Sequence, residues 1–367
     1  MNPIGRHLAT LGLEPWRGPT VLTADEARAL CLTAPHEGLV ALLGAAVDHE
    51  VVRVDPAAAA VVAAAWGERM EWCVRLDTVL LSVVGHLAAA GIDTRVLKGV
   101  AVAALDEPDP GWRSYGDVDV LVPDHRFLDA VDALATAGWR PAIPPVSRRW
   151  LGEFAKGITL VDGSGAQVDL HRLLATGVLG ERVRMAALFA DGQAFTVAGV
   201  TLTALAPVHR FLHACYHASL GGVTGARHMR DVLLLAHKVS PSQVEARLEA
   251  RTEARREEGW SRAVVHDALT TAGTWGALPE AWGAWLGACA IDPDEREMVA
   301  RRHGTFGDKA GRHVRELPGL GAKVRYLAPL LWPASAHLAA RGSSRITHLR
   351  RTVLGRAFAN QGSRRGR

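Results

Sequence analysis

Residues 97–139 read LKGVAVAALDEPDPGWRSYGDVDVLVPDHRFLDAVDALATAGW. The Pro- and Gly-rich segment at 106–116 predicts a loop, and the alternating residues at 117–122 predict a strand directly after it. Residues two apart in a strand project from the same face, so Asp117 and Asp119 present two carboxylates side by side. Like charges this close are costly in an otherwise apolar strand, which makes the pair a candidate functional site.

A second short stretch supplies a third acid. Residues 167–174 read QVDLHRLL, where Asp169 has the apolar neighbours of a buried strand and His171 shares its face. If the two strands pair, Asp117, Asp119 and Asp169 converge into a triad suited to a divalent metal such as Mg²⁺, which prefers oxygen ligands. The alternatives are that DVD is an exposed strand with polar ends, and that His171 is a strand-end residue rather than one that orients a carboxylate. Since the acids repel each other, we expect Asp119→Asn to leave the metal-free fold intact or to stabilise it.

Hydrophobic spacing gives a coarse secondary structure for the rest of the chain. The helical patterns lie at residues 23–66, 68–91, 100–105, 124–138, 207–220 and 227–238. The extended patterns lie at residues 94–97, 117–122, 158–161, 167–171 and 195–205, the last being a hairpin with Gly199 at its turn. Thr23 and Asp124 are predicted to cap the helices that follow them.

The order of these patterns predicts an α+β fold, with a mixed sheet flanked by helices and with N-terminal and C-terminal helical extensions. A chain of 367 residues is too long for one small core, so several units are expected. The predicted regions are an N-terminal helical region at 1–66, an α/β domain at 67–205, a helical domain at 206–340 and a basic tail at 341–367.

These stretches resemble an uncharacterised nucleotidyltransferase family of the polymerase-β-type superfamily. Members show an LKG turn, an R-x-x-G-D-x-D-x-L-V strand, a helix that ends in Gly and an aromatic residue, and a later V-D-L-H strand. The matching positions here are residues 97–99, 113–122, 138–139 and 168–171. The resemblance covers about residues 75–240 and implies that residues 67–205 form a nucleotidyltransferase-like catalytic domain.

The resemblance also implies roles for the acids. Asp117 and Asp119 would bind two metal ions, and Asp169 would bind the ion that activates the acceptor. The implied reaction moves a nucleoside monophosphate from an NTP to an acceptor and releases pyrophosphate, with Mg²⁺ or Mn²⁺ as cofactor.

The predicted triphosphate contacts come from the turn and the loop. The resemblance implies that Lys98, Arg113 and Ser114 contact the phosphates. Gly99 would let the backbone approach phosphate oxygens closely, and Arg113 offers a planar fork for them. Val100 departs from the wider superfamily, which has Gly or Ser after the turn glycine, so one hydroxyl donor is missing.

The acceptor is not named by the sequence. A hydroxyl or phosphate of a small molecule, peptide or protein is favoured over nucleic acid, because no basic strip with interleaved aromatic residues lies near the triad. Two alternatives stay open: a catalytically silent nucleotide-binding accessory module, and an RNA-directed, toxin-like transferase that uses the tail at 341–367 as an electrostatic handle.

Charge and composition fit a cytoplasmic protein. The tail at 341–367 holds eight arginines and no acid, so the net charge of +4 becomes −4 for residues 1–340 once these eight are subtracted. The tail is expected to be dispensable for folding. Four scattered cysteines form no CxxC pair and are expected to be reduced. No leader sequence is predicted, and the longest apolar stretches, 56–66 and 326–340, are shorter than the ~20 residues of a membrane span.

Three histidines repeat every four residues in the helical pattern at 207–220. His209, His213 and His217 therefore share one face. A zinc or manganese site is one interpretation, but a structural stripe or a wall of the nucleotide cleft is favoured because no further ligand accompanies them. The resemblance to the family also covers His213, His217, Arg230 and Asp231, and implies that they pack the helical half onto the catalytic half. The alternative is that Arg227 and Arg230 reach acceptor or phosphate.

Overall fold

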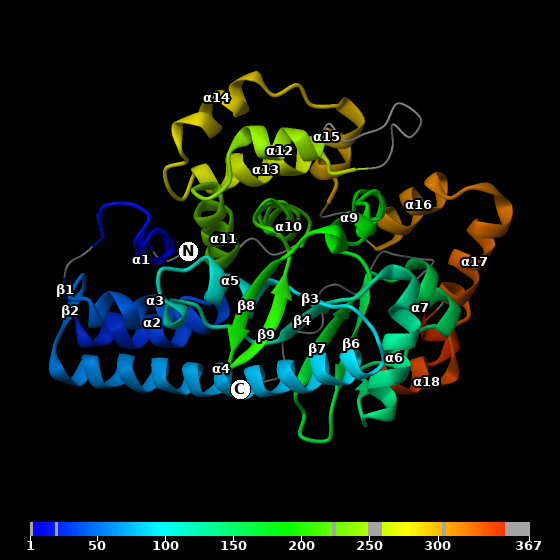
Figure 1. Ribbon diagram of the computed structural model, residues 1–367, viewed down its shortest axis with the longest axis horizontal. Coiled ribbons are helices and arrows are strands. Elements are labelled where there is room, and N and C mark those ends of the chain that lie inside the picture. The colour runs from blue at the N-terminus through cyan, green and yellow to red at the C-terminus, as the bar shows by residue number, and fades with distance from the viewer. Residues whose placement is uncertain (1–2, 19–20, 222–224, 249–258, 303–305, 349–367) are drawn as a thin grey trace.

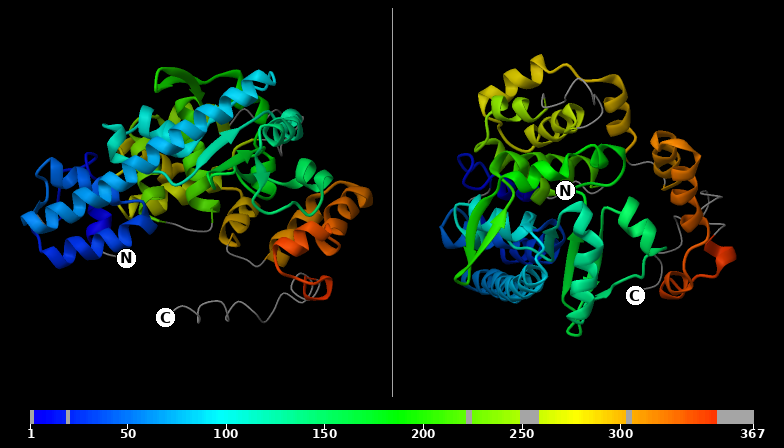
Figure 2. Two further views of the ribbon diagram at one scale, coloured as in Figure 1. Left: turned by 90° about the horizontal axis from the view of Figure 1, so that it is seen from below. Right: turned by 45° about the vertical axis from the view of Figure 1, so that its right-hand side comes forward.

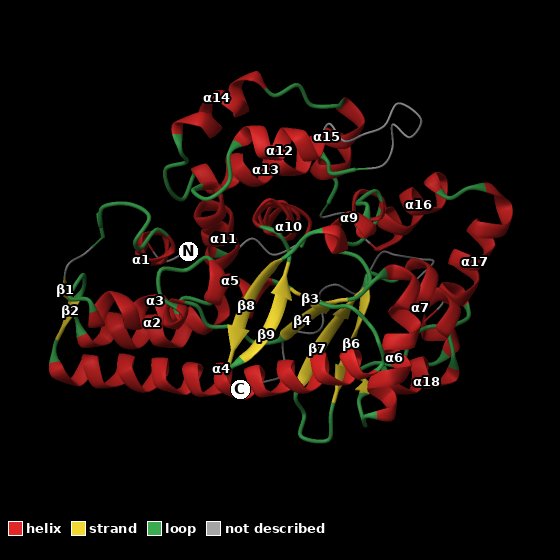
Figure 3. Cartoon of the chain, viewed as in Figure 1, coloured by secondary structure: helices red, strands yellow, loops and turns green. Residues whose placement is uncertain are grey.

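The computed structural model shows a mixed sheet between two groups of helices (Figure 1). Figure 3, coloured by secondary structure, shows the strands β3 to β9 near the centre of the molecule and β1 and β2 at its left edge. The predicted α+β fold with helical extensions at both ends is confirmed. The residues that the structure describes are 3–18, 21–221, 225–248, 259–302 and 306–348.

The central sheet has seven strands in the order β5-β6-β7-β4-β3-β9-β8. The pairs β4–β7 and β3–β9 are parallel, and the other four pairs are antiparallel. All five extended patterns of the sequence form part of it, whereas the two-residue edge strand β5 was not predicted. The strands are β3 (Arg95–Val96), β4 (Val118–Leu121), β5 (Arg140–Pro141), β6 (Gly157–Val161), β7 (Gln167–His171), β8 (Gln193–Val197) and β9 (Val200–Ala204).

The predicted hairpin turn at Gly199 is confirmed. Ala198 and Gly199 join β8 to β9 and both have positive φ, at 47° and 82°. Two such residues form the hairpin turn whose twist matches that of the strands.

The described residues of the N-terminal part of the chain form three helices and a two-stranded sheet. Thr23 caps its helix as predicted, since its Oγ1 accepts from the Glu26 N–H at 3.3 Å and its own N–H donates to Glu26 Oε2 at 2.9 Å. These elements are α1 (Pro3–Ala9), β1 (Val21–Leu22), α2 (Ala24–Glu37), α3 (Val40–Asp48) and β2 (Arg53–Val54).

A single 34-residue helix, α4 (Pro56–Ala89), runs from the N-terminal helices to the sheet (Figure 2, left). The predicted separation of helices near residues 66–68 is wrong, and the boundary drawn after residue 66 lies inside α4. Asp55 caps the helix by accepting from the Ala58 N–H at 2.8 Å, and Pro56 occupies its first turn. Gly67 meets no neighbouring atoms there, so it costs the helix only ~1 kcal/mol.

In length and apolar composition, α4 is also the one helix of the described residues that could cross a bilayer. About 28% of its most apolar window is buried. A core helix of a protein without any membrane segment passes the same test, and α4 packs on the sheet through Leu76, Leu80 and Val83.

The predicted cap of the next helix is wrong. α6 (Phe127–Thr136) follows a short 3₁₀ turn (Asp124–Arg126), and the Asp124 side chain makes no cap bond. Its Oδ1 instead accepts from Arg172 Nη1 at 2.7 Å. The helix is followed at Gly138 by a positive φ of 92°, as the sequence indicated.

The helices after residue 206 share a core with the sheet. α10 (Pro207–Leu220) has the predicted bounds, and its Phe211 and Tyr216 are buried in one cluster with Leu97 and Leu121 beside the strands. The accompanying helices are α11 (Ala226–Ala236), α12 (Pro241–Leu248), α13 (Arg262–Gly273), α14 (Glu280–Ala288) and α15 (Pro293–Ala300).

The last helices pack against α7 (Arg148–Phe154), on the far side of the sheet from α1 (Figure 2, right). Trp150 Nε1 donates to the Tyr326 carbonyl at 3.1 Å, and Arg325 donates to Glu153 at 2.9 Å. These helices are α16 (Phe306–Glu316), α17 (Gly319–Leu331) and α18 (Ser335–Ala340). Most of the predicted tail, residues 349–367, lies outside the described residues.

Candidate metal and nucleotide site

The two predicted acidic strands are neighbours at the centre of the sheet. β4 pairs in parallel with β7, and their register sets Asp119 directly opposite Asp169. Ligand atoms of Asp119, Asp169 and His171 all lie within 4.8 Å of one another, so this group could hold a metal ion. The expected approach of Asp119 to Asp169 is confirmed, while their catalytic and metal-binding roles stay predictions.

Asp119 is the most constrained of the acids. It is 4% exposed, and its Oδ1 accepts from Lys98 Nζ at 2.6 Å and contacts His171 Nε2 at 2.7 Å. Burial alone would raise the pKa of Asp119, but the charges and hydrogen bonds of Lys98 and His171 outweigh it and hold that pKa far below its usual range. The expectation that Asp119→Asn relieves the metal-free protein is therefore reversed, because the mutation would remove a paired charge.

Asp117 precedes β4 and is half-buried. Burial raises its pKa, and the negative charges of Asp119 and Asp169 raise it further, against the opposing effect of Lys98. Asp117 thus lies in the field of the other two acids, although the group that could share one ion contains His171 in its place. Its role as a third carboxylate ligand stays a prediction.

Asp169 has a hydrogen bond that the sequence did not reveal. Thr159 Oγ1, on the neighbouring strand β6, donates to Asp169 Oδ1 at 2.6 Å. The antiparallel register of β6 and β7 sets these two residues opposite each other. Thr159 therefore fixes the orientation of the carboxylate.

The four predicted nucleotide-binding residues lie on helix α5 (Lys98–Leu105) and in the loop before β4. Lys98 has a positive φ of 45° and pairs with Asp119. Gly99 has no room for a side chain, since a Cβ there would lie 2.5 Å from Tyr115 Cβ. Ser114 is buried, and Arg113 pairs with Asp231 on α11 through both terminal nitrogens. Their contact with a triphosphate stays a prediction.

Three buried Arg–carboxylate pairs, here called the loop clamp, tie the segment before β4 to α10 and α11. Each arginine uses two nitrogens on two carboxylate oxygens, which is the strongest geometry for such a pair. Arg230 thus packs the helical half onto the catalytic half, one of its two predicted roles. The pairs are Arg210–Asp106, Arg230–Glu107 and Arg113–Asp231.

The contacts of the histidine face of α10 fit a structural role, and His213 and His217 also line a small pocket with Lys98, as a wall of the nucleotide cleft would. His209 Nδ1 lies 3.3 Å from Asp191, and the ring of His217 contacts that of His228 edge-on at 4.5 Å. Burial, and then the charge of Lys98, hold the pKa of His213 well below its usual value. Within the described part of the chain, these histidines belong to no cluster that could hold a metal.

Lys156 is a second residue near the acids that the sequence did not predict. It precedes Gly157, which pairs with His171, so it lies beside the acids. Burial lowers the pKa of Lys156, as does the charge of Lys98, and the charges of Asp119 and Asp169 oppose them. Only the pairing of β6 with β7 brings Lys156 here, and no local motif marks it.

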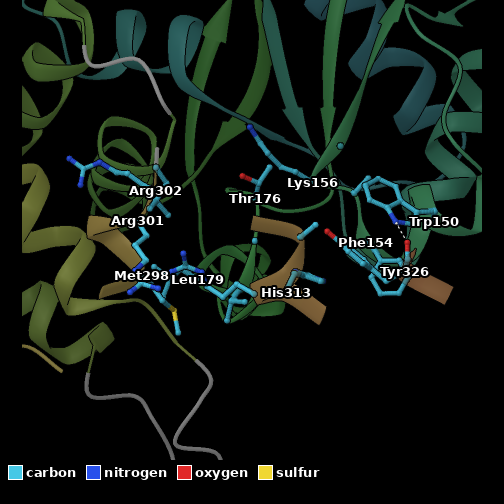
Figure 4. A pocket seen from close by; sticks show the side chains of 17 residues that line it. Trp150, Phe154, Lys156, Thr176, Leu179, Met298, Arg301, Arg302, His313 and Tyr326 are labelled. Atoms are coloured by element: carbon cyan, nitrogen blue, oxygen red, sulfur yellow. Dashed lines mark hydrogen bonds between the residues drawn. The ribbon is translucent and has the colours of Figure 1, made fainter. Parts of the chain in front are cut away.

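Lys156 also lines a cavity of about 450 Å³ (Figure 4). Trp150, Phe154 and Tyr326 form one wall, and Met298, Arg301 and Arg302 form the opposite one. A cavity of this size suits a small molecule.

The chain is similar to known proteins in sequence and, more weakly, in structure. The model of a family described as uncharacterised nucleotidyltransferases matches residues 23–272. Among solved structures, the chain is similar to an antigenic nucleotidyltransferase-like protein from Paracoccidioides brasiliensis, with 15% identity and a TM-score of 0.34 over 60% of this chain and 95% of that one. No curated protein matches.

Proposed function

Because this chain belongs to the family of uncharacterised nucleotidyltransferases, we propose that it transfers a nucleoside monophosphate from an NTP to an acceptor and releases pyrophosphate. The observation that carries the proposal is the convergence of Asp119, Asp169 and His171 in the central strands. Carboxylates so arranged are what metal-assisted phosphoryl transfer needs.

The residues present fit a divalent cation. Asp119 and Asp169 offer hard oxygen ligands, and Asp117 has a raised pKa because burial and its acidic neighbours disfavour its charge. Asp119 and Asp169 would hold Mg²⁺ or Mn²⁺, with Asp117 as a further ligand. When bound, the cation lowers the pKa of an acceptor hydroxyl and offsets charge on the leaving group.

The remaining steps fall to the chain's own residues. The acceptor oxygen forms a bond to the α-phosphorus of the NTP, the bond from that phosphorus to the pyrophosphate oxygen breaks, and pyrophosphate leaves with the electron pair. Asp169 takes the acceptor proton, and Thr159 holds the carboxylate in place. Lys98, which pairs with Asp119 in the metal-free protein, turns to the phosphates of the donor.

The test is transfer of label from each NTP. The protein is incubated with the four α-labelled NTPs, Mg²⁺ or Mn²⁺, and lysate of the source organism, and mass spectrometry identifies products that carry an NMP. Asp169→Asn should abolish transfer, whereas the control Asp162→Asn should not, since Asp162 accepts hydrogen bonds only within the β6–β7 turn. Loss of one electrostatic stabiliser costs on the order of 10²–10³ in rate, and a metal ligand more. Wild-type transfer by Asp169→Asn would refute the proposal.

A further inference from the structure

The cavity beside Lys156 is built partly from helices outside the residues that match the family. The match ends at residue 272, whereas Met298, His313 and Tyr326 come from α15, α16 and α17, and Arg302 directly follows α15. The rest of the lining comes mainly from α7, the residues that follow it up to Gly157, and the segment around α8 (Val178–Glu181). Part of the cavity lining therefore lies after the residues that match the family.

The sheet order decides which reactant lies nearest to this cavity. The strands lie in the order β6-β7-β4-β3, and the acids lie on the two inner strands, β7 and β4. Lys156 directly precedes β6, and Lys98 follows β3 after one intervening residue. The two lysines thus flank the acids from opposite sides. Lys98 and α5 lie on the Asp119 side, where the donor phosphates are proposed, and the cavity lies on the Asp169 side, where the acceptor proton leaves.

Two buried nitrogen atoms of the described residues around the cavity make no hydrogen bond, although the Arg302 guanidinium also lies 3.4 Å from Asp267 through Nη1. In the part of the chain that the structure describes, Arg302 Nε and His313 Nε2 are buried without a hydrogen bond. The Glu181 carboxylate is 3.4 Å from His313 Nε2, yet makes no hydrogen bond to it. Lys156 and Arg312 form no ion pair with any other described residue. A buried donor without a partner costs ~1–3 kcal/mol, which an acceptor oxygen of a ligand would recover.

The other cavity walls are flat and apolar. The Tyr326 ring stacks on His313 with centroids 4.4 Å apart and meets Phe154 edge-on at 5.2 Å. Figure 4 shows these rings facing the arginine-bearing wall, with Lys156 and Thr176 between them. An aromatic wall opposite cations suits a ligand with a flat apolar body and a negative group.

We propose that this cavity is the acceptor site and that the acceptor is an anionic small molecule with a flat, apolar body. This inference rests on the proposed function, since it assumes a transfer centred on Asp169. It narrows the acceptor from small molecule, peptide or protein to one chemical class, and it assigns Arg302 and Arg312 to the recognition of that negative group.

The test measures binding apart from turnover. The full chain is titrated separately with 2-naphthyl phosphate, 2-naphthoate and neutral 2-naphthol, and the affinity of each is measured by calorimetry. We expect at least one of the anions to bind roughly tenfold or more tighter than 2-naphthol, because a charge-assisted hydrogen bond contributes at least that much. Preference for the phosphate over the carboxylate, or the reverse, identifies the source of the negative charge.

Variants locate the binding. Arg302→Gln should weaken the anion about tenfold or more, and Arg312→Gln provides a second variant if the first does not fold. The control is Arg325→Gln, whose exposed side chain pairs with Glu153 outside the cavity lining. Neither cavity variant should change Mn²⁺-dependent NTP binding.

Three results of the probe titrations would overturn the inference: no saturable binding of any probe, equal binding of 2-naphthol and the anions, or an unchanged affinity in folded Arg302→Gln and Arg312→Gln. Weakened NTP binding in these variants would also overturn it, because the cavity would then hold the donor. Transfer that persists in Asp169→Asn would refute the proposed function instead, and it leaves the anion titration unaffected, so the two failures are distinguishable.

Discussion

The Arg230–Glu107 pair of the loop clamp allows a quantitative prediction. The side chains are 1% and 0% exposed, and their two N–O contacts measure 2.8 and 2.6 Å. Arg230 also donates to the carbonyls of Ala9 and Leu11 at 3.1 and 2.9 Å. Glu107→Gln keeps the shape of the side chain but leaves a buried guanidinium without its counter-charge. Such a break costs ~3–5 kcal/mol, a large part of the ~5–15 kcal/mol that stabilises a domain.

A pair of the same chemistry on the surface supplies the control. Arg148 and Asp132 make two contacts of 2.8 and 2.5 Å, but their side chains are 55% and 59% exposed. Asp132→Asn should therefore cost only ~0–1 kcal/mol. The free energy of unfolding is measured in urea by circular dichroism and tryptophan fluorescence, whose transitions must coincide. If the two mutants lose stability within about 1 kcal/mol of each other, burial does not set the strength of the clamp.

Three further predictions concern the acids. Asp119→Asn should destabilise the metal-free protein by ~3–5 kcal/mol because it leaves Lys98 unpaired, whereas Asp117→Asn should not destabilise it. Thermal melting in EDTA compares the two mutants. A larger loss of stability in Asp117→Asn would contradict the opposite pKa shifts of the two acids. Saturating Mn²⁺, at about 100 times its Kd, should stabilise the wild type by ~2.7 kcal/mol and Asp169→Asn by much less. An equal shift in melting temperature in the two proteins would show that Mn²⁺ binds at a site that does not include Asp169. Burial raises the pKa of Glu181 from 4.5 to about 7, so the folded state holds an extra proton between these values and the free energy of unfolding falls as pH rises through them. Glu181→Gln should remove this dependence of the free energy of unfolding on pH. An unchanged dependence in the mutant would exclude Glu181 as its source.

Features that depend on a few neighbouring residues, such as helix starts, strands and turns, could be predicted from the sequence. Pro207 set the start of α10, alternation set β7, and the pair of positive-φ residues before β9 formed the expected turn. The acids of the candidate site were found in the same way, because the period of a strand places Asp117 and Asp119 on one face. Their neighbour Asp169 needed one further assumption, the pairing of two strands, which the register confirms.

Contacts between distant residues were not readable. The pair Arg113–Asp231 joins positions 118 apart, so no local pattern indicated that the arginine predicted to contact the triphosphate has a buried carboxylate partner. Lys156 carries no motif and reaches the acids only because β6 pairs with β7. The continuity of α4 was missed for a related reason: an isolated Gly67 reads as a weak point, but packing along a long apolar face outweighs its cost.

The residues proposed for the reaction and those proposed to recognise the acceptor lie in different parts of the fold. The acids are fixed by the register of two central strands, so a change in them would disturb the sheet as well as the reaction. Part of the cavity walls instead comes from α15 to α17, which supply Met298, Arg312 and Tyr326, and α17 contacts α7 through Trp150–Tyr326 and Arg325–Glu153. Such walls can change without moving Asp119 or Asp169, which is how one fold serves different substrates. If the cavity binds the acceptor, members of the family that share the acids but differ after residue 272 should therefore differ in acceptor while keeping the same transfer of an NMP.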